Sequence, residues 1–392
     1  MREVVIISAA RTAIARSPKG ALRCTRPDDI AAVVISAVIA RAPGLAADEI
    51  EDVILGCAMP EFEQGMDVAR VALLRAGLPQ SVPGLTLNRF CASGLEAIAT
   101  GAAKIATGQA ETVIAGGTES MTMVQFMGHT TRPNPYLMEH KPDTYLSMGL
   151  SVERLAKEFG ITREQADHFS LSSHLKALAA QDEGRFDAEI VPMYVETTEP
   201  DGDVMRVACT TFARDEGPRR DTSLEALARL KPAFTADGTI TAGNASQRSD
   251  GAAAITLTTV ERATQLGIAP LARFVDYAVC SVAPERFGIA PAYAIPKLLE
   301  RNGLTIDQID LIEFNEAFAA QVLASSSIYP MPMERVNVNG GAVALGHPLG
   351  ATGARQTVTA IYESRRRGSK FVMVAMCAAL GMGAAALFEI YS

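Results

Sequence analysis

Residues 85–117 read LTLNRFCASGLEAIATGAAKIATGQAETVIAGG, and this stretch decides the fold. LTLN has the composition of a buried strand that ends at Asn88, and TVIAGG has that of a second strand from Thr112. Between them, apolar residues follow Cys91 at helical spacing. A strand, a cysteine turn, a helix and a strand predict an α/β architecture with mostly parallel sheets that helices cover on both faces.

The same rhythm occurs twice along the chain. The first series is completed by strands at EVVII and DVILGC and by helices over 28–41 and 65–76. The second series, after Pro270, has strands at LARFVDYAV, DLIEF, RVNVN and KFVMVAM and helices over 292–301, through AFAAQVLA and after Gly350. In both series a strand ends in Asn, at Asn88 and Asn339. The pattern favours a duplicated α/β domain whose helical faces pack together, with chance similarity of two βαβ runs as the alternative.

Residues 118–249 interrupt this rhythm. They contain a stretch with Pro, Met and His, two helical segments and a long polar connection. Thr162 with Gln165 forms a capping-box pattern that predicts the start of a long helix. We therefore divide the chain into an N-terminal α/β domain (1–117, returning at 250–269), an inserted loop domain (118–249) and a C-terminal α/β domain (270–392).

Composition and charge exclude several classes of protein. The 392 residues allow roughly two or three domains. No tract reaches about 18 uninterrupted apolar residues, so no membrane span is expected, and the formal net charge of −8 argues against a nucleic-acid partner. The opening MREVVIISAART is not typical of a signal peptide, and the six cysteines form no CxxC pair or cluster. We expect a cytoplasmic protein with free thiols and no metal site.

Cys91 is the candidate nucleophile. Its place at the N-terminus of a helix favours thiolate, because the helix dipole contributes about 0.3–1 kcal/mol at an exposed site and free N–H groups hold an anion there. A cysteine packed in the core is the alternative, and the residues around Cys91 alone do not decide between them.

His347 is the candidate base. It lies in NVNGGAVALGHPLGATGAR, where glycines let the backbone approach a ligand closely. A histidine there can accept a proton from a thiol and later donate a hydrogen bond to an oxyanion. The other histidines fall in the inserted region and are expected on the surface or in packing: His129, His140, His168 and His174.

Two further polar residues follow buried strands. Asn315 closes DLIEF, where an amide that only caps the next helix is the alternative to a catalytic role. Cys377 follows KFVMVAM and enters a glycine-containing turn. We interpret Cys91 and Cys377 as matching positions of the two halves. Together with one histidine and one asparagine at comparable turns, they form a candidate catalytic constellation.

Five successive segments resemble the signature segments of the thiolases: NRFCASGL, TAGNASQRSDGAAA, FNEAFAAQ, NVNGGAVALGHPLGATGAR and CAALGMGAAA. The resemblance covers essentially the whole chain, and the glycine-rich histidine segment and the last cysteine segment are its most specific parts. It implies the thiolase fold, in which two duplicated α/β domains form a layered αβαβα arrangement with an inserted loop domain. It also implies a homodimer or tetramer.

The resemblance further implies catalytic roles. Cys91 would carry the acyl group, His347 would activate Cys91, and Cys377 would move the proton of the substrate α-carbon or of the coenzyme A thiol. One oxyanion would be bound by His347 and by a water that Asn315 holds. The other would be bound by the backbone N–H groups of Cys91 and Ala379.

Coenzyme A is implied as a co-substrate, with no permanently bound cofactor. The resemblance places Arg219 near the adenine and 3′-phosphate of coenzyme A and Ser246 against its pantetheine. From composition alone, Arg219 with Arg214 and Arg220 in ARDEGPRRDTS is equally well a patch for a polyanionic small ligand or a solvated charged loop.

The chain departs from the commonest thiolase pattern in two places. Residues 378–380, Ala-Ala-Leu, stand before Gly381, where the family has glycines sooner. If Ala379 needed a positive φ, the oxyanion site would be distorted at a cost of about 1–3 kcal/mol; the Leu-Gly pair that follows is similar to degradative bacterial members. Ser147 replaces the histidine of an HMG sequence in short-chain biosynthetic members, which favours a degradative enzyme.

The expected function is that of an acetyl-CoA C-acyltransferase. Such an enzyme cleaves 3-oxoacyl-CoA with coenzyme A to acetyl-CoA and a shortened acyl-CoA, as in fatty acid β-oxidation, whose other enzymes are candidate partners. One alternative is an acetyl-CoA C-acetyltransferase acting on acetoacetyl-CoA, and another is a non-catalytic thiolase-like protein that binds coenzyme A or lipid. A ketosynthase-like enzyme usually has no second catalytic cysteine, so Cys377 argues against it.

Overall fold

The computed structural model describes residues 2–128, 132–202 and 204–391. In these residues a ten-stranded sheet has the order β10-β11-β12-β9-β1-β8-β5-β3-β4, and β2 pairs with β8 beside this path. Its strands are β1 (Val4–Arg11), β2 (Ala15–Arg16), β3 (Asp52–Gly56), β4 (Gly84–Leu87), β5 (Thr112–Ser120), β8 (Ser249–Thr259), β9 (Ala272–Ser281), β10 (Leu311–Phe314), β11 (Phe371–Ala378) and β12 (Met382–Ile390).

The sheet consists of two halves whose strands follow in the same succession, except that β4 at the edge of the N-terminal half has no counterpart in the C-terminal half. From the centre outward, the N-terminal half runs β1-β8-β5-β3-β4 and the C-terminal half runs β9-β12-β11-β10. The halves meet where β1 pairs with β9, with Val5 opposite Arg273 and Ile6 opposite Ala272. The predicted duplication of an α/β domain is therefore confirmed.

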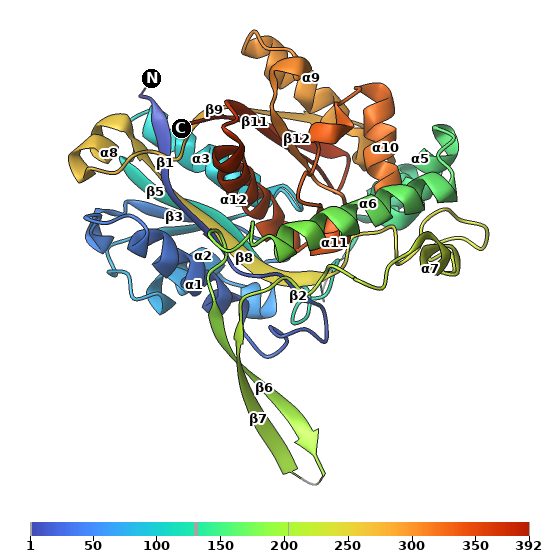
Figure 1. Ribbon diagram of the computed structural model, residues 1–392, viewed down its shortest axis with the longest axis horizontal. Coiled ribbons are helices and arrows are strands. Elements are labelled where there is room, and N and C mark those ends of the chain that lie inside the picture. The colour runs from blue at the N-terminus through green and yellow to red at the C-terminus, as the bar shows by residue number, and fades with distance from the viewer. Residues whose placement is uncertain (1, 129–131, 203, 392) are drawn as a thin grey trace.

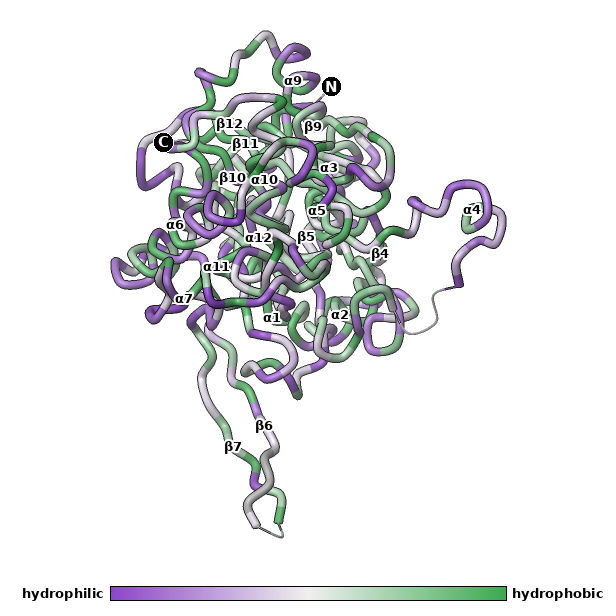
Figure 2. The backbone as a smooth tube through the Cα atoms, turned by 90° about the vertical axis from the view of Figure 1, so that its right-hand side faces the viewer, coloured by the Kyte–Doolittle hydropathy of each residue, from purple (hydrophilic) through white to green (hydrophobic). Residues whose placement is uncertain are grey.

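Helices form three layers around the two halves (Figures 1 and 2). In the middle layer α3 (Ser93–Ala106) packs on α12 (Leu349–Arg367), and α12 contacts strands of both halves. The outer layers are α1 (Pro27–Ala40) and α2 (Val68–Arg75) on the N-terminal half and α9 (Pro291–Arg301) on the C-terminal half. This is the predicted αβαβα arrangement. The remaining α-helices are α4 (Pro135–His140), α5 (Met148–Glu158), α6 (Arg163–Asp182), α7 (Leu224–Ala228), α8 (Val260–Leu266), α10 (Ala319–Ile328) and α11 (Ala342–Leu345).

The expectation of mostly parallel sheets is wrong, because the sheet is mixed. Parallel pairing joins β4 to β3, β3 to β5 and β10 to β11. The remaining pairs are antiparallel. The physical reason lies in the connections: β12 follows β11 through a tight turn, and β8 returns after the long insertion, so neither requires the helical crossover that parallel neighbours need.

RVNVN is not a strand of the sheet. Only an isolated parallel bridge joins Val336 to Ile312. Asn337 turns the chain with a φ of 46°, its Oδ1 accepts a hydrogen bond from the Phe314 N–H (2.8 Å), and its Nδ2 donates to the Phe314 carbonyl (2.7 Å). The asparagine side chain thus makes the hydrogen bonds with β10 that a strand backbone would have made.

The inserted region contains an element that the sequence analysis missed. The expected long polar connection contains the hairpin of β6 (Met193–Asp201) and β7 (Val204–Phe212), which projects from the body of the molecule (Figures 1 and 2). The predicted capping box is confirmed, since Thr162 and Gln165 cap α6 reciprocally. The exact domain boundaries stay a prediction.

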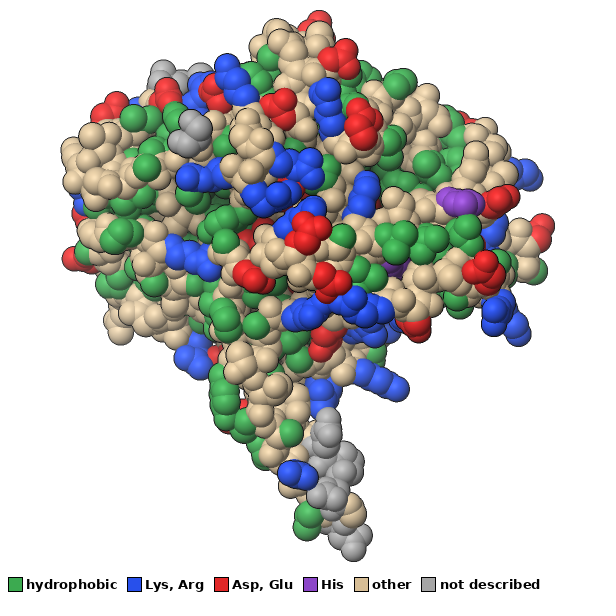
Figure 3. Space-filling model, in the orientation of Figure 1, with side chains coloured by type: hydrophobic (Ala, Val, Ile, Leu, Met, Phe, Trp, Pro, Cys, Tyr) green, Lys and Arg blue, Asp and Glu red, His purple; other side chains and the backbone are tan. Residues whose placement is uncertain are grey.

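Acidic and basic side chains alternate over the face of the molecule in Figure 3. This agrees with a modest net charge and with the many ion pairs at the surface, such as Arg301 with Asp276 and Arg286 with Glu158. Among the helices of the described residues, none is both long and apolar enough to cross a membrane.

Candidate active site

Cys91 lies in the turn between β4 and α3. Phe90, just before it, has a φ of 47°, which reverses the chain. Ser93 fixes this turn, because its Oγ accepts a hydrogen bond from the Arg89 N–H (2.8 Å) and donates one to the Phe90 carbonyl (2.6 Å). Only 8% of Cys91 is exposed. The thiol therefore lies at the N-terminus of α3, as the sequence predicted.

The resting charge of Cys91 differs from the expectation. The pKa of the Cys91 thiol is raised to about 12, mainly by burial and to a smaller extent by the nearby Glu119 carboxylate. The backbone N–H groups of Cys91 and Ala379 approach the sulfur and lower the pKa, but they do not offset the loss of hydration. The prediction of a thiolate at rest is therefore wrong, and a base must remove the proton when Cys91 attacks.

His347 has the properties of such a base. Its Nδ1 lies 2.6 Å from Thr352 Oγ1, and Thr352 donates its own proton to the Pro348 carbonyl (2.9 Å). The threonine oxygen must then accept, so Nδ1 carries the imidazole proton and Nε2 offers a lone pair. Burial, and then the Arg355 charge, lower the His347 pKa to about 3, so the ring is neutral.

Asn315 holds the lone-pair side of His347. It follows β10 directly, and its Nδ2 lies 3.3 Å from His347 Nε2. Asn315 is fully buried, and its Oδ1 has no hydrogen-bond partner among the described residues. It does not cap the next helix, because the N-cap of α10 is Phe318. A buried amide with one open acceptor is a suitable partner for a water or a substrate hydroxyl.

Cys377 lies near the end of β11 and is fully buried. Burial, and then the Cys91 thiol, raise its pKa, so the two thiols, one from each half, are near enough to interact. In the turn that follows, the positive φ values belong to Leu380 (62°) and Gly381 (81°). Ala379 is not among the residues with positive φ, so the distortion of the oxyanion site that a positive φ would cause is absent.

The interpretation of Cys91 and Cys377 as matching positions is wrong. Cys91 precedes α3 as His347 precedes α12, the equivalent helix. Cys377 lies opposite Gly383 of β12, whereas Glu119 lies opposite Gly251 of β8, so Cys377 and Glu119 are equivalent. The sequence pattern alone could not separate these registers.

The beginnings of α3 and α12 touch, which joins Cys91 and His347 at one end of the middle layer. A Cβ added to Gly94 would lie 2.7 Å from the Gly350 carbonyl, so this crossing excludes any side chain. Each glycine comes three residues after its catalytic candidate. Thr352, which sets the histidine tautomer, was not predicted from the sequence. Its place in the first helical turn after a candidate base was the available signal.

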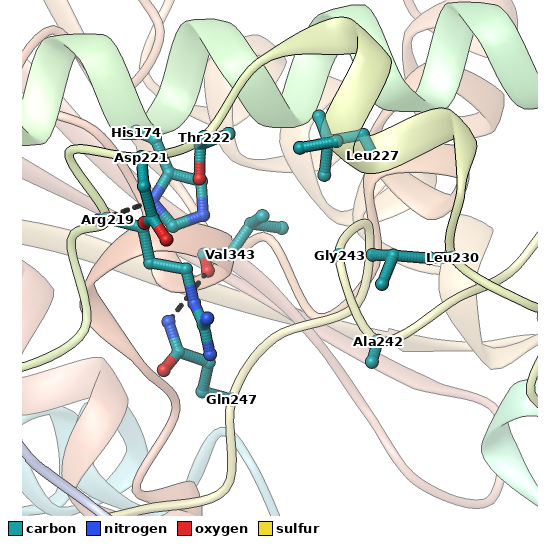
Figure 4. Close-up of a pocket in the computed structure, with 11 residues that line it drawn as sticks. His174, Arg219, Asp221, Thr222, Leu227, Leu230, Ala242, Gly243, Gln247 and Val343 are labelled. Carbon is teal, nitrogen blue, oxygen red and sulfur yellow. Dashed lines mark hydrogen bonds between the residues drawn. The ribbon is translucent and has the colours of Figure 1, made fainter.

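A pocket lies near His347, whose N–H donates to the carbonyl of the lining residue Gln247 (3.0 Å) (Figure 4). Arg219 and Gln247 line it, together with His174, whose Nδ1 accepts a hydrogen bond from the Arg219 N–H (3.2 Å). Ser246 is next to Gln247, and its N–H donates to the Ala317 carbonyl (2.9 Å). The further lining residues are Asp221, Thr222, Ala226, Leu227, Leu230, Ala242, Gly243 and Val343.

The remaining histidines partly follow the expectation. His140 and His168 are exposed, and His129 lies outside the described residues. His174 is buried but lines the pocket instead of serving only in packing. Among the residues that the structure describes, no group of three or more His, Cys, Asp or Glu has the arrangement of a metal site.

Two family models match the chain in succession. Residues 4–261 match the thiolase N-terminal domain, and residues 268–390 match the thiolase C-terminal domain. With the duplicated fold and the grouped Cys91, His347, Asn315 and Cys377, this shows that the chain belongs to the thiolase family.

Individual relatives are similar over their whole length. The chain is 48% identical to a 3-ketoacyl-CoA thiolase of Bacillus subtilis over 391 residues, which covers 100% of both chains. It is 43% identical to the human peroxisomal 3-ketoacyl-CoA thiolase over 99% of this chain and 91% of that protein. The crystal structures of Bacillus anthracis acetyl-CoA acetyltransferase (39% identity) and human mitochondrial 3-ketoacyl-CoA thiolase (34% identity) each superpose with a TM-score of 0.89, over 100% of this chain and 99% of theirs.

Proposed function

We propose that the protein is an acetyl-CoA C-acyltransferase that cleaves 3-oxoacyl-CoA with coenzyme A through an acyl-cysteine at Cys91. The observation that carries this proposal is the surroundings of the Cys91 sulfur. Two backbone N–H groups approach it, and the Cys377 thiol lies close by. A nucleophile, anion-binding donors and a second acid/base are what carbon–carbon cleavage of a thioester requires.

In the first half-reaction His347 Nε2 takes the proton of the Cys91 thiol as the sulfur attacks the 3-oxo carbon. The bond between C2 and C3 breaks, and its electron pair passes into the enolate of acetyl-CoA. Cys377 protonates C2 of this enolate and becomes a thiolate. Acetyl-CoA leaves, and Cys91 retains the shortened acyl group.

In the second half-reaction the Cys377 thiolate takes the proton of the coenzyme A thiol. The coenzyme A sulfur attacks the acyl carbon, and the Cys91 thiolate leaves and recovers the proton from His347. Each sulfur and the imidazole thus return to their starting state, which matches the neutral resting forms that burial imposes on Cys91 and His347.

Two oxyanions form at different places in this scheme. The tetrahedral centre on Cys91 is bound by the N–H groups of Cys91 and Ala379. The thioester enolate is bound by His347 and by a water on Asn315. The open Oδ1 of Asn315 supports the second role, because it provides the acceptor that such a water needs. Preorganised donors of this kind each contribute about 10²–10³ to the rate.

Coenzyme A would enter through the pocket lined by Arg219 and Gln247. We assign the nucleotide end to Arg219 and the pantetheine to the segment with Ser246. The apolar Leu227 and Leu230 on one side and the polar Gln247 on the other suit a ligand with alternating methylene and amide groups (Figure 4).

We also propose a homodimer or higher oligomer built on β4. This strand is at the edge of the large sheet and exposes Leu85, while Val71 and Leu74 are exposed on the adjacent α2. Identical edges can pair across a twofold axis. Light scattering on Leu85→Lys would give a smaller particle than the native chain, and an unchanged mass would contradict this interface. The cytoplasmic location remains a prediction from the cysteine pattern.

The function is tested by following the loss of the magnesium-enhanced absorbance of 3-oxoacyl-CoA with acyl chains of several lengths. We expect coenzyme A-dependent cleavage of chains longer than acetoacetyl-CoA. Cleavage confined to acetoacetyl-CoA would favour an acetyl-CoA C-acetyltransferase. No turnover at any length would contradict an enzymatic role.

A further inference from the structure

Arg16 is an arginine outside the catalytic group whose backbone is firmly held. It lies on β2, where it pairs with Ser249 of β8. Its N–H donates to Glu216 Oε2 (2.8 Å), and the other oxygen of that carboxylate accepts from the Ala21 N–H (2.9 Å). The start of the Arg16 side chain is therefore fixed relative to the segment that carries Arg219.

The guanidinium group lies next to Gln247, a residue that lines the pocket proposed for coenzyme A. Arg16 Nη2 donates to the Gly217 carbonyl (3.3 Å), and the same oxygen accepts from Gln247 Nε2 (3.0 Å). Gln247 and Arg219 both line the pocket and face one another in Figure 4. Sharing one carbonyl oxygen places the Arg16 guanidinium directly beside the polar side of the pocket.

This guanidinium has unused hydrogen-bonding capacity. Its Nε is buried and has no hydrogen-bond partner within the residues that the structure describes. A guanidinium group whose donors are not all hydrogen-bonded is costly to hold in a partly buried place.

The charges around Arg16 favour an anion. Burial, and then the positive charge of Arg219, lower the Arg16 pKa, while Glu216 and Asp221 raise it. Burial and the charges of Arg219 and Arg16 also lower the pKa of His174, to about 4, with Asp221 opposing them. Two arginines that repel each other beside a pocket are stabilised by a ligand of high negative charge.

We propose that Arg16 and Arg219 together bind a phosphate group of the nucleotide end of coenzyme A. The proposal rests on the proposed function and adds a residue from the N-terminal segment to the ligand site. Arg16 does not touch the reacting atoms, so it acts on binding and not on the chemical steps. It gives the pocket a preference for the phosphorylated ligand over bare pantetheine.

The test compares Arg16→Gln with the native enzyme for three thiol acceptors: coenzyme A, 3′-dephospho-coenzyme A and pantetheine. Lys19→Gln is the matched control, because it removes the same charge from an exposed site in the same loop. We expect Arg16→Gln to raise the KM for coenzyme A about tenfold with kcat unchanged, the effect of losing one charge-assisted hydrogen bond. With pantetheine we expect no change, and Lys19→Gln should behave as the native enzyme throughout.

The measurement with 3′-dephospho-coenzyme A shows which phosphate group of coenzyme A Arg16 binds. If the Arg16→Gln defect disappears with 3′-dephospho-coenzyme A, the 3′-phosphate is the ligand, and if the defect persists, the diphosphate is. An equal loss with pantetheine and coenzyme A, or no loss with coenzyme A, would overturn the proposal. Normal turnover of pantetheine by both forms would leave the proposed reaction intact, so the two failures are distinguishable.

Discussion

The two halves of the molecule use one scaffold for different chemistry. Their strands follow in the same succession, and three positions near the site correspond. Cys57 follows β3 as Asn315 follows β10, and Cys91 precedes α3 as His347 precedes α12. Glu119 is the next-to-last residue of β5, as Cys377 is of β11. In the proposed mechanism the N-terminal half supplies the nucleophile, whereas the C-terminal half supplies the base, the amide and the second thiol.

The two halves differ because the polar side chains near the site in the N-terminal half already have hydrogen-bond partners. Glu119 accepts from the N–H groups of Ala58 and Gly350, both at 2.7 Å, and from Gln64 Nε2 at 2.8 Å. Cys57 lies against the same carboxylate at 3.7 Å. Asn315, by contrast, keeps an open acceptor. At equivalent positions, a side chain therefore has a structural role where neighbouring groups satisfy its hydrogen bonds. It is available for catalysis where one of its polar atoms has no partner.

The largest expected effect is a difference in turnover between variants of two buried cysteines of the N-terminal half, Cys91 and Cys57. Cys91→Ala should lower turnover by at least about 10⁴-fold, because no other group can carry the acyl chain. Cys57→Ala is the matched control and should keep its kcat, with a loss of about 1 kcal/mol in the free energy of unfolding. Steady-state cleavage and urea unfolding measure both, and a comparable loss of turnover in the two variants would refute the contrast.

A smaller effect is expected at Asn315, the counterpart of Cys57. Asn315→Ala should lower kcat for cleavage by about 10²–10³-fold, because the enolate loses its water-mediated donor. Acylation of Cys91 by an activated thioester should change much less, since no enolate forms there. Rapid-quench measurements of both steps check this, and an equal loss in both steps would remove Asn315 from the enolate site.

A few-fold effect is expected where the halves are joined. The Tyr277 hydroxyl of β9 donates to Glu96 Oε2 (2.5 Å), and Glu96 also pairs with Arg89 beside the Cys91 turn. Tyr277→Phe should lower kcat roughly two- to fivefold with an unchanged KM, because Cys91 and Ala379 come from different halves and must stay aligned. Tyr391→Phe, which removes a hydroxyl bonded to Glu3 at the surface, is the control. A change in KM alone would contradict a positioning role.

The smallest effect concerns stability and pH. The folded-state pKa of His347 is about 3, below its usual value of about 6.5. Between these two pH values the unfolded chain binds more protons than the folded chain. The contribution of His347 to the free energy of unfolding is therefore complete above about pH 6.5 and is lost as the pH falls towards 3. Urea unfolding of His347→Gln should therefore depend less on pH in this window than that of the native protein. Exposed His140→Gln is the control, and identical slopes for all three proteins would contradict a buried neutral His347.

Residues close together in the sequence were sufficient to predict several structural features. Thr162 and Gln165 predicted the start of α6, and the strand before Cys91 and the glycine-rich turn around His347 predicted a thiol and a base at helix starts. Each of these depends on neighbours along the chain. The hairpin of β6 and β7 was missed although MYVETTEPDGDVMRV carries an alternating pattern around an Asp-Gly turn.

The failures came from contacts between distant residues. The bonds of Asn337 to Phe314 replace a strand, and no local pattern contains them. The charge of Cys91 was mispredicted because the effect of burial on its pKa outweighs that of the helix terminus. The strand pairing shows that the equivalent of Cys377 in the N-terminal half is Glu119 and not Cys91. The sequence pattern alone does not show this. The residues of the candidate site could be proposed from the sequence, whereas their protonation states and their equivalence between the halves depend on the tertiary fold.

The division of labour between the two thiols is tested most directly in Cys377→Ala. Mass spectrometry after rapid quenching would follow acylation of Cys91 by an activated thioester and, separately, by 3-oxoacyl-CoA. We predict acylation by the activated thioester within about tenfold of the native rate and a loss of about a thousandfold in carbon–carbon cleavage. Equal losses in both reactions, or cleavage at the native rate, would contradict the account.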